Sequence, residues 1–377
     1  MDIPLSLYVH IPWCVRKCPY CDFNSHQAGY VLPEREYVAS LLSDLLAQTR
    51  DAGGRPIRTV FIGGGTPSLF SGRAIGELLE GIDRLLPLAP DAEVTLEANP
   101  GTAEAKHFAD YRAAGVNRLS IGVQSLDDTK LAALGRIHDR SEALAAVDMA
   151  RAAGFDNLNL DLMYGLPQQS LVEALVDLDA TIALEPEHLS WYQLTLEPNT
   201  LFHHRPPPLP DDDLLGDIMD AGLDRLAVSG YAQYEISAHA GPGRAARHNL
   251  NYWQFGDYLG IGAGAHGKLT LSDGHIVRRM RPRHPQGYLQ QDFQDTNERE
   301  LSTAELPIEF MLNALRLVEG VPARLFAERT GLPLDVIATQ LDEGRVKGLM
   351  DTAPDKLRPT PLGLRYLNDL LAIFEPD

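Results

Sequence analysis

The three cysteines of this 377-residue chain are Cys14, Cys18 and Cys21, in the spacing C-x3-C-x2-C near the amino terminus. An odd number of thiols cannot form a complete disulfide framework, so a tight group of them indicates a bound metal. Three thiolates can hold a [4Fe-4S] cluster and leave one iron with an open position for a substrate or cofactor. A structural zinc ion with His26 as the fourth ligand is the alternative.

The composition limits the partners of the chain. Its formal net charge is −19, with 44% apolar and 23% charged residues. Nucleic acid and anionic membrane surfaces both select clustered Lys and Arg, so neither is expected as a partner, although a locally basic pocket is compatible with this charge. No apolar run reaches membrane-spanning length, and the start MDIPLSLYVH lacks the basic region of a signal peptide. We therefore expect a cytoplasmic protein.

Strand-like and helical patterns alternate through the first half of the chain, which predicts parallel βαβ units of an α/β fold. The expected strands are residues 5–11, 59–65, 93–99, 118–124, 158–165 and 188–196. Polar residues fall at or just past the carboxyl ends of these strands, where a barrel assembles its chemistry. They are Gly63 to Thr66, Glu97, Gln124 and Asp161. This placement favours a partial parallel (β/α)6 barrel over a doubly wound sheet.

The carboxyl-terminal part has a different pattern. From about residue 301, three short helices are followed by a turn-rich hairpin segment and a last helix over residues 361–374, an order typical of a winged-helix-like domain. Because this part is acidic and presents no basic recognition helix, we expect a structural or docking role. The predicted domains are a barrel at 1–240, a connecting region at 241–300 and the winged-helix-like domain at 301–377.

The cysteine spacing just after the first strand, together with GGGTP at residues 63–67, resembles the radical S-adenosylmethionine (SAM) superfamily. That resemblance implies a [4Fe-4S] cluster whose open iron is chelated by SAM. Further segments narrow it to the HemN family, which contains oxygen-independent coproporphyrinogen III dehydrogenase and a relative that is a heme chaperone. The segments are YVHIPWC, FIGGGTPS, EANPGT, GVNRLSIGVQS, LGRIH and NLDLMYGLP.

The resemblance assigns roles to residues of the barrel. Tyr8 and Tyr20 would lie against SAM or the cluster, and Glu97 would hydrogen-bond SAM. The segment Gly64, Gly65 and Thr66 would hold SAM through main chain and hydroxyl. The positions that match contacts to a second SAM molecule in HemN are Gln124, Arg136 and Asp161. From the residues alone, Glu97 or Asp161 could equally be a rim carboxylate paired to Arg118 or Arg136.

Two differences from the HemN sequence pattern distinguish a haem carrier from a dehydrogenase. HemN has a fourth cysteine two residues after the third, where this chain has Phe23. The chain also contains H-N-x-x-Y, in which His248 and Tyr252 would share one face of a helix. This motif resembles that of the heme chaperone relative. Imidazole and phenolate are both known haem ligands. The alternative is a structural role, in which the histidine is buried and hydrogen-bonded within an aromatic cluster. We expect His248 to ligate or contact haem iron.

The expected function is therefore that of a heme chaperone, with coproporphyrinogen III dehydrogenase as the alternative. The expected cofactors are the [4Fe-4S] cluster, SAM and haem. The haem propionates could pair with the basic run Arg278 to His284 or with Arg244 and Arg247, although such runs are more often solvated loops. The expected partner is a haem-acceptor protein that the sequence does not identify, with respiratory proteins as one candidate class. Membrane contact is expected only at the periphery, and only if the acceptor is membrane-bound.

Overall fold

The computed structural model describes residues 3–101, 106–293 and 297–375; Thr102, the last residue of the EANPGT segment, lies outside them. Its centre is a parallel sheet in the order β1-β4-β5-β6-β7-β8. Their bounds are β1 Leu5–Ile11, β4 Ile57–Gly64, β5 Leu88–Ala98, β6 Arg118–Gln124, β7 Leu158–Tyr164 and β8 His188–Gln193. These are the six expected strands, and the partial (β/α)6 barrel is confirmed.

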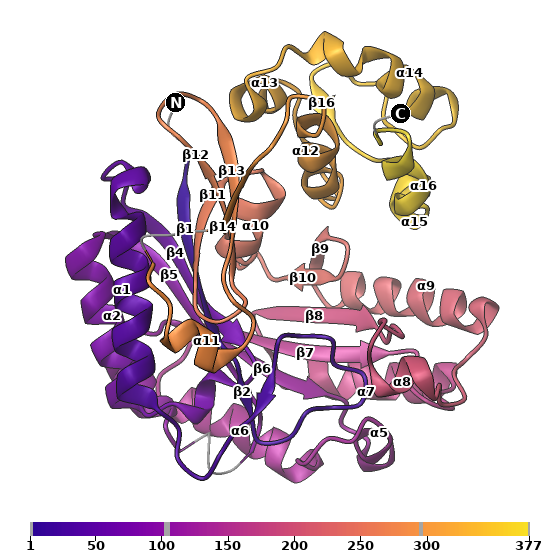
Figure 1. Cartoon of the computed structure of the whole chain (residues 1–377). Helices are drawn as coiled ribbons and strands as arrows, with labels where there is room; N and C mark the ends of the chain where they lie inside the picture. The colour runs from indigo at the N-terminus through magenta and orange to yellow at the C-terminus, as the bar shows by residue number, and fades with distance from the viewer. Residues whose placement is uncertain (1–2, 102–105, 294–296, 376–377) are drawn as a thin grey trace.

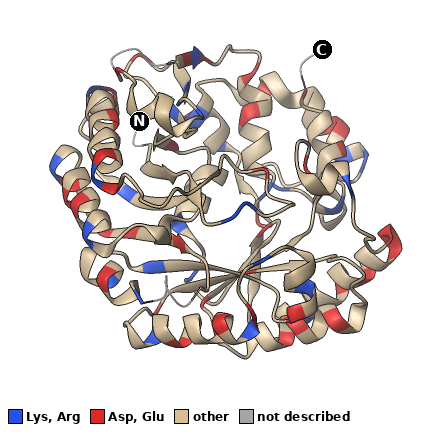
Figure 2. Ribbon diagram, turned by 60° about the horizontal axis from the view of Figure 1, so that its bottom comes forward, with Lys and Arg blue, Asp and Glu red and all other residues tan. Residues whose placement is uncertain are grey.

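Helices cover the outer face of this curved sheet (Figure 1). They are α1 Glu34–Ala52, α2 Gly72–Leu85, α4 Phe108–Ala114, α5 Asp128–Ala133, α6 Arg140–Ala152, α7 Leu171–Ile182 and α9 Asp212–Val228. Several begin with strong caps, such as the capping boxes at Asp139 and Ser170. Figure 2 shows Asp and Glu along these surrounding helices, so much of the negative charge lies on the outside of the barrel.

The strands separate polar from apolar side chains by strict alternation. In β1, Leu5, Leu7, Val9 and Ile11 are fully or almost fully buried in the main core, while Ser6, Tyr8 and His10 lie on the opposite face. The same alternation runs through β5 to β8, while a register shift between Ile57 and Thr59 interrupts it in β4. The inward-facing set, which also contains Met163, includes the cavity residues Glu97, Ser120 and Asp161. The apolar faces therefore point to the helices, and the barrel interior is polar.

The sheet continues beyond the barrel in both directions. On one side β11 Asp257–Ile261 pairs parallel with β1, and β12 His266–Thr270, β13 Ile276–Met280 and β14 Asn297–Glu300 follow antiparallel. On the other side β10 Ala238–Ala240 and β9 Ala232–Glu235 extend β8. The predicted connecting region therefore contributes strands to the barrel sheet. The boundaries at 240 and 300 remain predictions.

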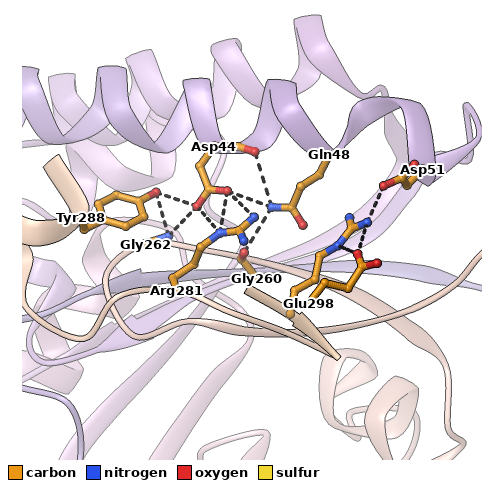
Figure 3. A network of polar contacts seen from close by, with 9 residues as sticks. Asp44, Gln48, Asp51, Gly260, Gly262, Arg281, Tyr288 and Glu298 are labelled. Carbon is orange, nitrogen blue, oxygen red and sulfur yellow. Dashed lines mark hydrogen bonds and ion pairs between the residues drawn. The ribbon is translucent and has the colours of Figure 1, made fainter. Parts of the chain in front are cut away.

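A buried polar network fixes this extension to the barrel (Figure 3). The carboxylate of Asp44, in α1, is 2.6 Å from Nη2 of Arg281 and accepts a hydrogen bond of 2.8 Å from the Tyr288 hydroxyl. Both charged side chains are at most 1% exposed. Nearby, Arg279 bridges Asp51 of α1 and Glu298 of β14. These contacts attach the segment from Arg279 to Tyr288, and Glu298 of β14, to α1.

The carboxyl-terminal domain has its own core, which includes Phe310, Phe326, Leu341 and Leu370. Its elements are α12 Leu306–Ala314, β15 Val321–Pro322, α13 Arg324–Thr330, a 3-10 turn Leu334–Ile337, α14 Ala338–Val346, β16 Lys356–Leu357, α15 Pro361–Arg365 and α16 Leu367–Ala372. The single last helix expected over 361–374 is wrong, because Tyr366, with φ −112° and ψ 47°, interrupts it. Within the described residues, no helix is long and apolar enough to span a bilayer.

Candidate functional site: a thiol-lined cavity at the barrel rim

The cysteines lie on a loop that follows β1. Two short parallel strands, β2 Trp13–Cys14 and β3 His26–Gln27, close this loop at its base. Its far side is fixed by Asn24, whose Nδ2 donates hydrogen bonds of 2.9 Å to the carbonyls of Ala263 and Arg283. The Asn24 carbonyl in turn contacts Nε2 of His10, on β1, at 2.9 Å. The loop is therefore held from both ends and from the distant segment after β11.

The three thiols line one cavity of about 530 Å³ at the carboxyl ends of the strands. The cavity gathers most of the predicted site residues, namely Cys14, Cys18, Cys21, Tyr20, Gly64, Gly65, Thr66, Glu97, Gln124, Arg136 and Asp161. Such a volume is typical of small-molecule and cofactor sites. Tyr8 is not among the lining residues; its hydroxyl bonds Nδ1 of His10 at 2.9 Å, and its ring stacks on Phe61.

The glycines of GGGTP are required by the cysteine loop itself. Gly64 has φ of +116°, and a Cβ there would lie 2.5 Å from the His10 ring, while one at Gly65 would lie 2.6 Å from the Trp13 carbonyl oxygen. The N–H groups of Gly65 and Thr66 donate to the carbonyls of Ile11 and Trp13. The carbonyl oxygens of this turn are thus the main-chain groups suited to accept from an amino group of a ligand.

Two partly buried carboxyl groups line the same cavity. Glu97 accepts a hydrogen bond of 3.0 Å from the Gly64 N–H, and burial together with the nearby Asp161 raises the pKa of Glu97 to about 8. Burial also raises the pKa of Asp161, against hydrogen bonds from Asn159, Ser190 and Ser120. Among the described residues neither carboxyl group forms an ion pair with an arginine, so the predicted alternative of a structural pair is not seen.

Arg136 lies directly beside the cysteines. Its Nη2 donates to Oδ1 of Asn99 at 2.6 Å and to the Gly122 carbonyl at 3.0 Å, and its Nη1 is 3.6 Å from the Cys18 sulfur. Gln124, a non-glycine residue at positive φ (67°), accepts from the Tyr192 hydroxyl at 2.8 Å. Asn99 lines the same cavity and was missed at the sequence level, although it stands in the EANPGT segment two residues after Glu97.

His26 is not among the residues that line the cavity. Its Nε2 is 3.3 Å from the Arg283 carbonyl oxygen, and its ring lies edge-on to His284 with centroids 5.4 Å apart. A Cys3His zinc site would require this imidazole to point at the cysteines. The donor set at the cavity is therefore three thiols, which fits a [4Fe-4S] cluster with one open iron.

The H-N-x-x-Y motif lies at the opposite end of the barrel. It forms α10 Arg247–Trp253, and His248 and Tyr252 share one face of this helix as predicted. The Nδ1 atom of His248 is 2.7 Å from the hydroxyl of Thr59, which lies near the amino end of β4, whereas the cavity lies at the carboxyl ends. The helix also contacts α12 of the carboxyl-terminal domain. Thus α10 lies between the amino end of the barrel and that domain.

Both ring nitrogens of His248 are engaged. Besides Thr59 at Nδ1, the Tyr252 hydroxyl lies 2.8 Å from Nε2, and the imidazole is 1% exposed. Burial, with a smaller contribution from Arg118, lowers the pKa of His248 to about 3. The ring is therefore neutral at physiological pH and packs against Phe61, with centroids 5.2 Å apart. Haem ligation stays a prediction, and it would require these hydrogen bonds to open.

The basic run proposed for propionates is used mostly inside the protein. Arg278 contacts Tyr258 and Glu309, and Arg279 and Arg281 form the pairs described above. On the surface, Arg247 pairs with Asp91 at 3.1 Å and Arg244 lies 3.9 Å from Asp156. Arginines with carboxylate partners are poorly suited to recognise propionates unless those pairs break.

Comparison with known proteins now defines the class. Residues 8–180 match the radical SAM superfamily and residues 301–366 match the HemN C-terminal domain. The solved structure of coproporphyrinogen III oxidase (HemN) from Escherichia coli, a radical SAM enzyme, superposes with a TM-score of 0.83, 23% identity, and coverage of 99% of this chain and 90% of that one. At this identity the likeness shows the fold. The chain is a radical SAM protein, a class whose members carry a [4Fe-4S] cluster and SAM.

The particular family follows from the sequence relatives. The heme chaperone HemW of Escherichia coli is 54% identical over 371 residues, and that of Haemophilus influenzae is 49% identical over 375 residues, each covering 98% of both chains. The heme chaperone HemW of Bacillus subtilis is 34% identical with the same coverage. The chain therefore belongs to the HemW family.

Proposed function

We propose that the protein is a heme chaperone, which binds haem and transfers it to an acceptor protein. The observation that carries this proposal is the 54% identity, over 98% of both chains, to a protein named heme chaperone HemW. The likeness to HemN extends over the whole fold but has only 23% identity. It therefore does not favour the dehydrogenase alternative.

The cavity supports a cofactor role for its end of the barrel. Cys14, Cys18 and Cys21 would hold the cluster, and Glu97 with the carbonyls of the GGGTP turn would hold the amino group of SAM. When bound, this pair supplies one-electron chemistry at the open iron. Phe23, at the position of the fourth HemN cysteine, lines the same cavity and is 61% exposed, so it contributes apolar surface to the entrance. Three thiols suffice for the cluster without a fourth.

We place the haem contact at α10. Tyr252 and Tyr258 lie edge to face with centroids 4.4 Å apart, and Phe61 and Trp253 add flat apolar surface around His248. Because His248 is buried and hydrogen-bonded, ligation of haem iron requires one of two movements. Either α10 shifts away from Thr59, or the Tyr252 side chain turns away from Nε2 of His248. The carboxyl-terminal domain, which packs on α10, is the part of the chain best placed to permit that movement.

The acceptor is a second protein, with respiratory haem proteins as the candidate class, and a membrane-bound acceptor would bring the chaperone to a membrane surface only peripherally. The net charge of −19 would favour an acceptor with a basic docking surface. The acidic side chains on the outer helices supply the negative electrostatic potential that would attract such a surface (Figure 2). The proposed location is the cytoplasm.

The decisive experiment compares carrier and enzyme activity in one preparation. The anaerobically reconstituted protein is titrated with haem and followed by its Soret band, then mixed with an apo-haem protein as a surrogate acceptor. The same preparation is supplied with coproporphyrinogen III, SAM and a reductant. We expect saturable haem binding, transfer to the acceptor and no protoporphyrinogen IX. Turnover to protoporphyrinogen IX, or the absence of saturable haem binding, would overturn the proposal.

A further inference from the structure

The Cys18 thiol receives a hydrogen-bond donor from the barrel. Nη1 of Arg136 is 3.6 Å from the Cys18 sulfur. Donors of this kind orient cluster ligands and stabilise negative charge on their sulfurs.

Asn99 connects Arg136 to the GGGTP turn. Its Oδ1 accepts from Nη2 of Arg136 at 2.6 Å, and its Nδ2 donates to Oγ1 of Thr66 at 3.0 Å. A guanidinium can only donate, so the amide must turn its oxygen to Arg136 and its nitrogen to Thr66. The Thr66 hydroxyl therefore fixes the orientation of the Asn99 amide, and with it the acceptor that holds Arg136.

Arg136 is held by more than Asn99. Its Nη2 also donates to the Gly122 carbonyl, on β6, which fixes the plane of the guanidinium toward Cys18. Its Nε is buried and has no hydrogen-bond partner among the described residues. The same side chain can therefore serve the thiolate through Nη1 and a ligand in the cavity through Nε, since arginine carries five donors.

We propose that Asn99, with its amide oriented by Thr66, is a positioning residue that aims Arg136 at Cys18, and that this network raises the reduction potential of the [4Fe-4S] cluster. The reason is electrostatic: reduction places additional negative charge on the cluster and its thiolates, and hydrogen-bond donors stabilise the reduced form more than the oxidised form. The inference rests on the cluster that membership of the radical SAM class implies and is independent of the proposed haem transfer.

The test is a redox titration of the anaerobically reconstituted protein, followed by electron paramagnetic resonance without SAM or haem. Asn99→Ala should shift the midpoint potential to more negative values at full iron and sulfide content. Arg136→Lys should shift it in the same direction although the charge is retained, because lysine lacks the planar fork that joins Asn99 and Cys18. The double variant should shift less than the sum of the two, since both act through one network.

Two controls make the result specific. Thr195→Val removes a hydroxyl from the same cavity that bonds Glu197 and no thiol, so the potential should stay at the wild-type value. Thr66→Ser keeps the hydroxyl that orients Asn99 and should also keep the potential, whereas Thr66→Val should lower it. This pair decides the matter if Asn99→Ala fails to hold a cluster. Wild-type potentials in both Asn99→Ala and Thr66→Val, or an equal shift in Thr195→Val, would overturn the proposal.

Discussion

Nε2 of His248 lies 2.8 Å from the hydroxyl oxygen of Tyr252, and Nδ1 of the same ring lies 2.7 Å from the hydroxyl oxygen of Thr59. The histidine proposed as a haem contact is thus fully hydrogen-bonded within the protein. Any ligation of iron must exchange one of these bonds for a bond to the metal. A small movement of the Tyr252 side chain would release the hydrogen bond to Nε2 without a shift of α10, because His248 and Tyr252 both lie on this helix.

We predict that His248→Ala shifts or abolishes the Soret signature of added haem while cluster content is retained, because the cysteines lie at the other end of the barrel. Tyr252→Phe should have a smaller effect if the ring only packs on the porphyrin, and an equal effect if its oxygen is a ligand. His266→Ala is the comparison, since this exposed histidine lies on β12 and not on α10. An unchanged spectrum and affinity in His248→Ala would move the assignment to His266 or His239.

A second prediction concerns the stability of the cluster-free protein above pH 6.5. Burial, together with Asp161, raises the pKa of Glu97 to about 8, against a usual value of 4.5. The folded state therefore retains a proton that the unfolded chain has lost, so stability decreases as pH rises between these values, by about 1.4 kcal/mol per pH unit. Urea unfolding at pH 6.5 and 8 should show this loss in the wild type. Glu97→Gln should lack it, and Asp161→Asn should reduce it.

A third prediction concerns His239, on β10. The side chain is 1% exposed, and neither ring nitrogen has a hydrogen-bond partner among the described residues. Burial lowers the pKa of His239 to about 4. Below pH 6.5 the unfolded chain therefore binds a proton that the folded protein does not bind. As a result, the free energy of unfolding falls by about 2 kcal/mol between pH 6.5 and 5.

His239→Leu should therefore stabilise the protein at pH 7 by about 1–3 kcal/mol, since it removes two buried unsatisfied polar atoms. It should also remove the part of the acid sensitivity that His239 causes. His138→Leu is the matched control, because Nε2 of His138 is 3.0 Å from the Val123 carbonyl oxygen and its loss should destabilise the fold. Chemical denaturation at both pH values measures the difference. Destabilisation by His239→Leu at pH 7 would contradict this account.

A fourth prediction concerns the buried pair in Figure 3. Asp44→Ala should lower the free energy of unfolding by about 3–5 kcal/mol, because it leaves the guanidinium of Arg281 buried without its carboxylate. The double variant Asp44→Ala with Arg281→Met should recover part of this loss. For comparison, Glu328→Ala breaks the exposed pair with Arg324 and should change stability by less than about 1 kcal/mol. A full double-mutant cycle without coupling between Asp44 and Arg281 would show that the pair is not the cause.

The sequence was informative where a local pattern determines the structure. Alternation of apolar and polar residues locates the strands to within a few positions, and the polar residues at their carboxyl ends mark the cavity. The helix that places His248 and Tyr252 on one face was equally predictable, because a spacing of four is a local property. Asn99 could have been found in the same way, since it follows β5 directly.

What could not be predicted depends on contacts between distant segments. Nothing in H-N-x-x-Y indicates that its partner is Thr59, some 190 positions earlier, or that the helix closes the amino end of the barrel. The basic run at residues 278–284 suggested a ligand site, but its partners Asp44 and Asp51 lie on α1 and Glu309 lies on α12, all distant in sequence. Pairing across the sheet is set by the whole topology, which a local pattern does not contain.

The parallel pairing of β1 with β11 affects how the chain can fold during synthesis. Leu5 pairs with Asp257 and Val9 with Ile261, so β1 lacks one of its two neighbours until more than 250 further residues have been made. The hydrogen bond from Asn24 to the Arg283 carbonyl can form only later still, because Arg283 follows β11 in the chain. Pairings of such sequence separation form slowly, and translation adds only about 5–20 residues per second. The thiols are thus presented on an incompletely supported loop for many seconds, and we expect stable cluster insertion to follow synthesis of the central sheet.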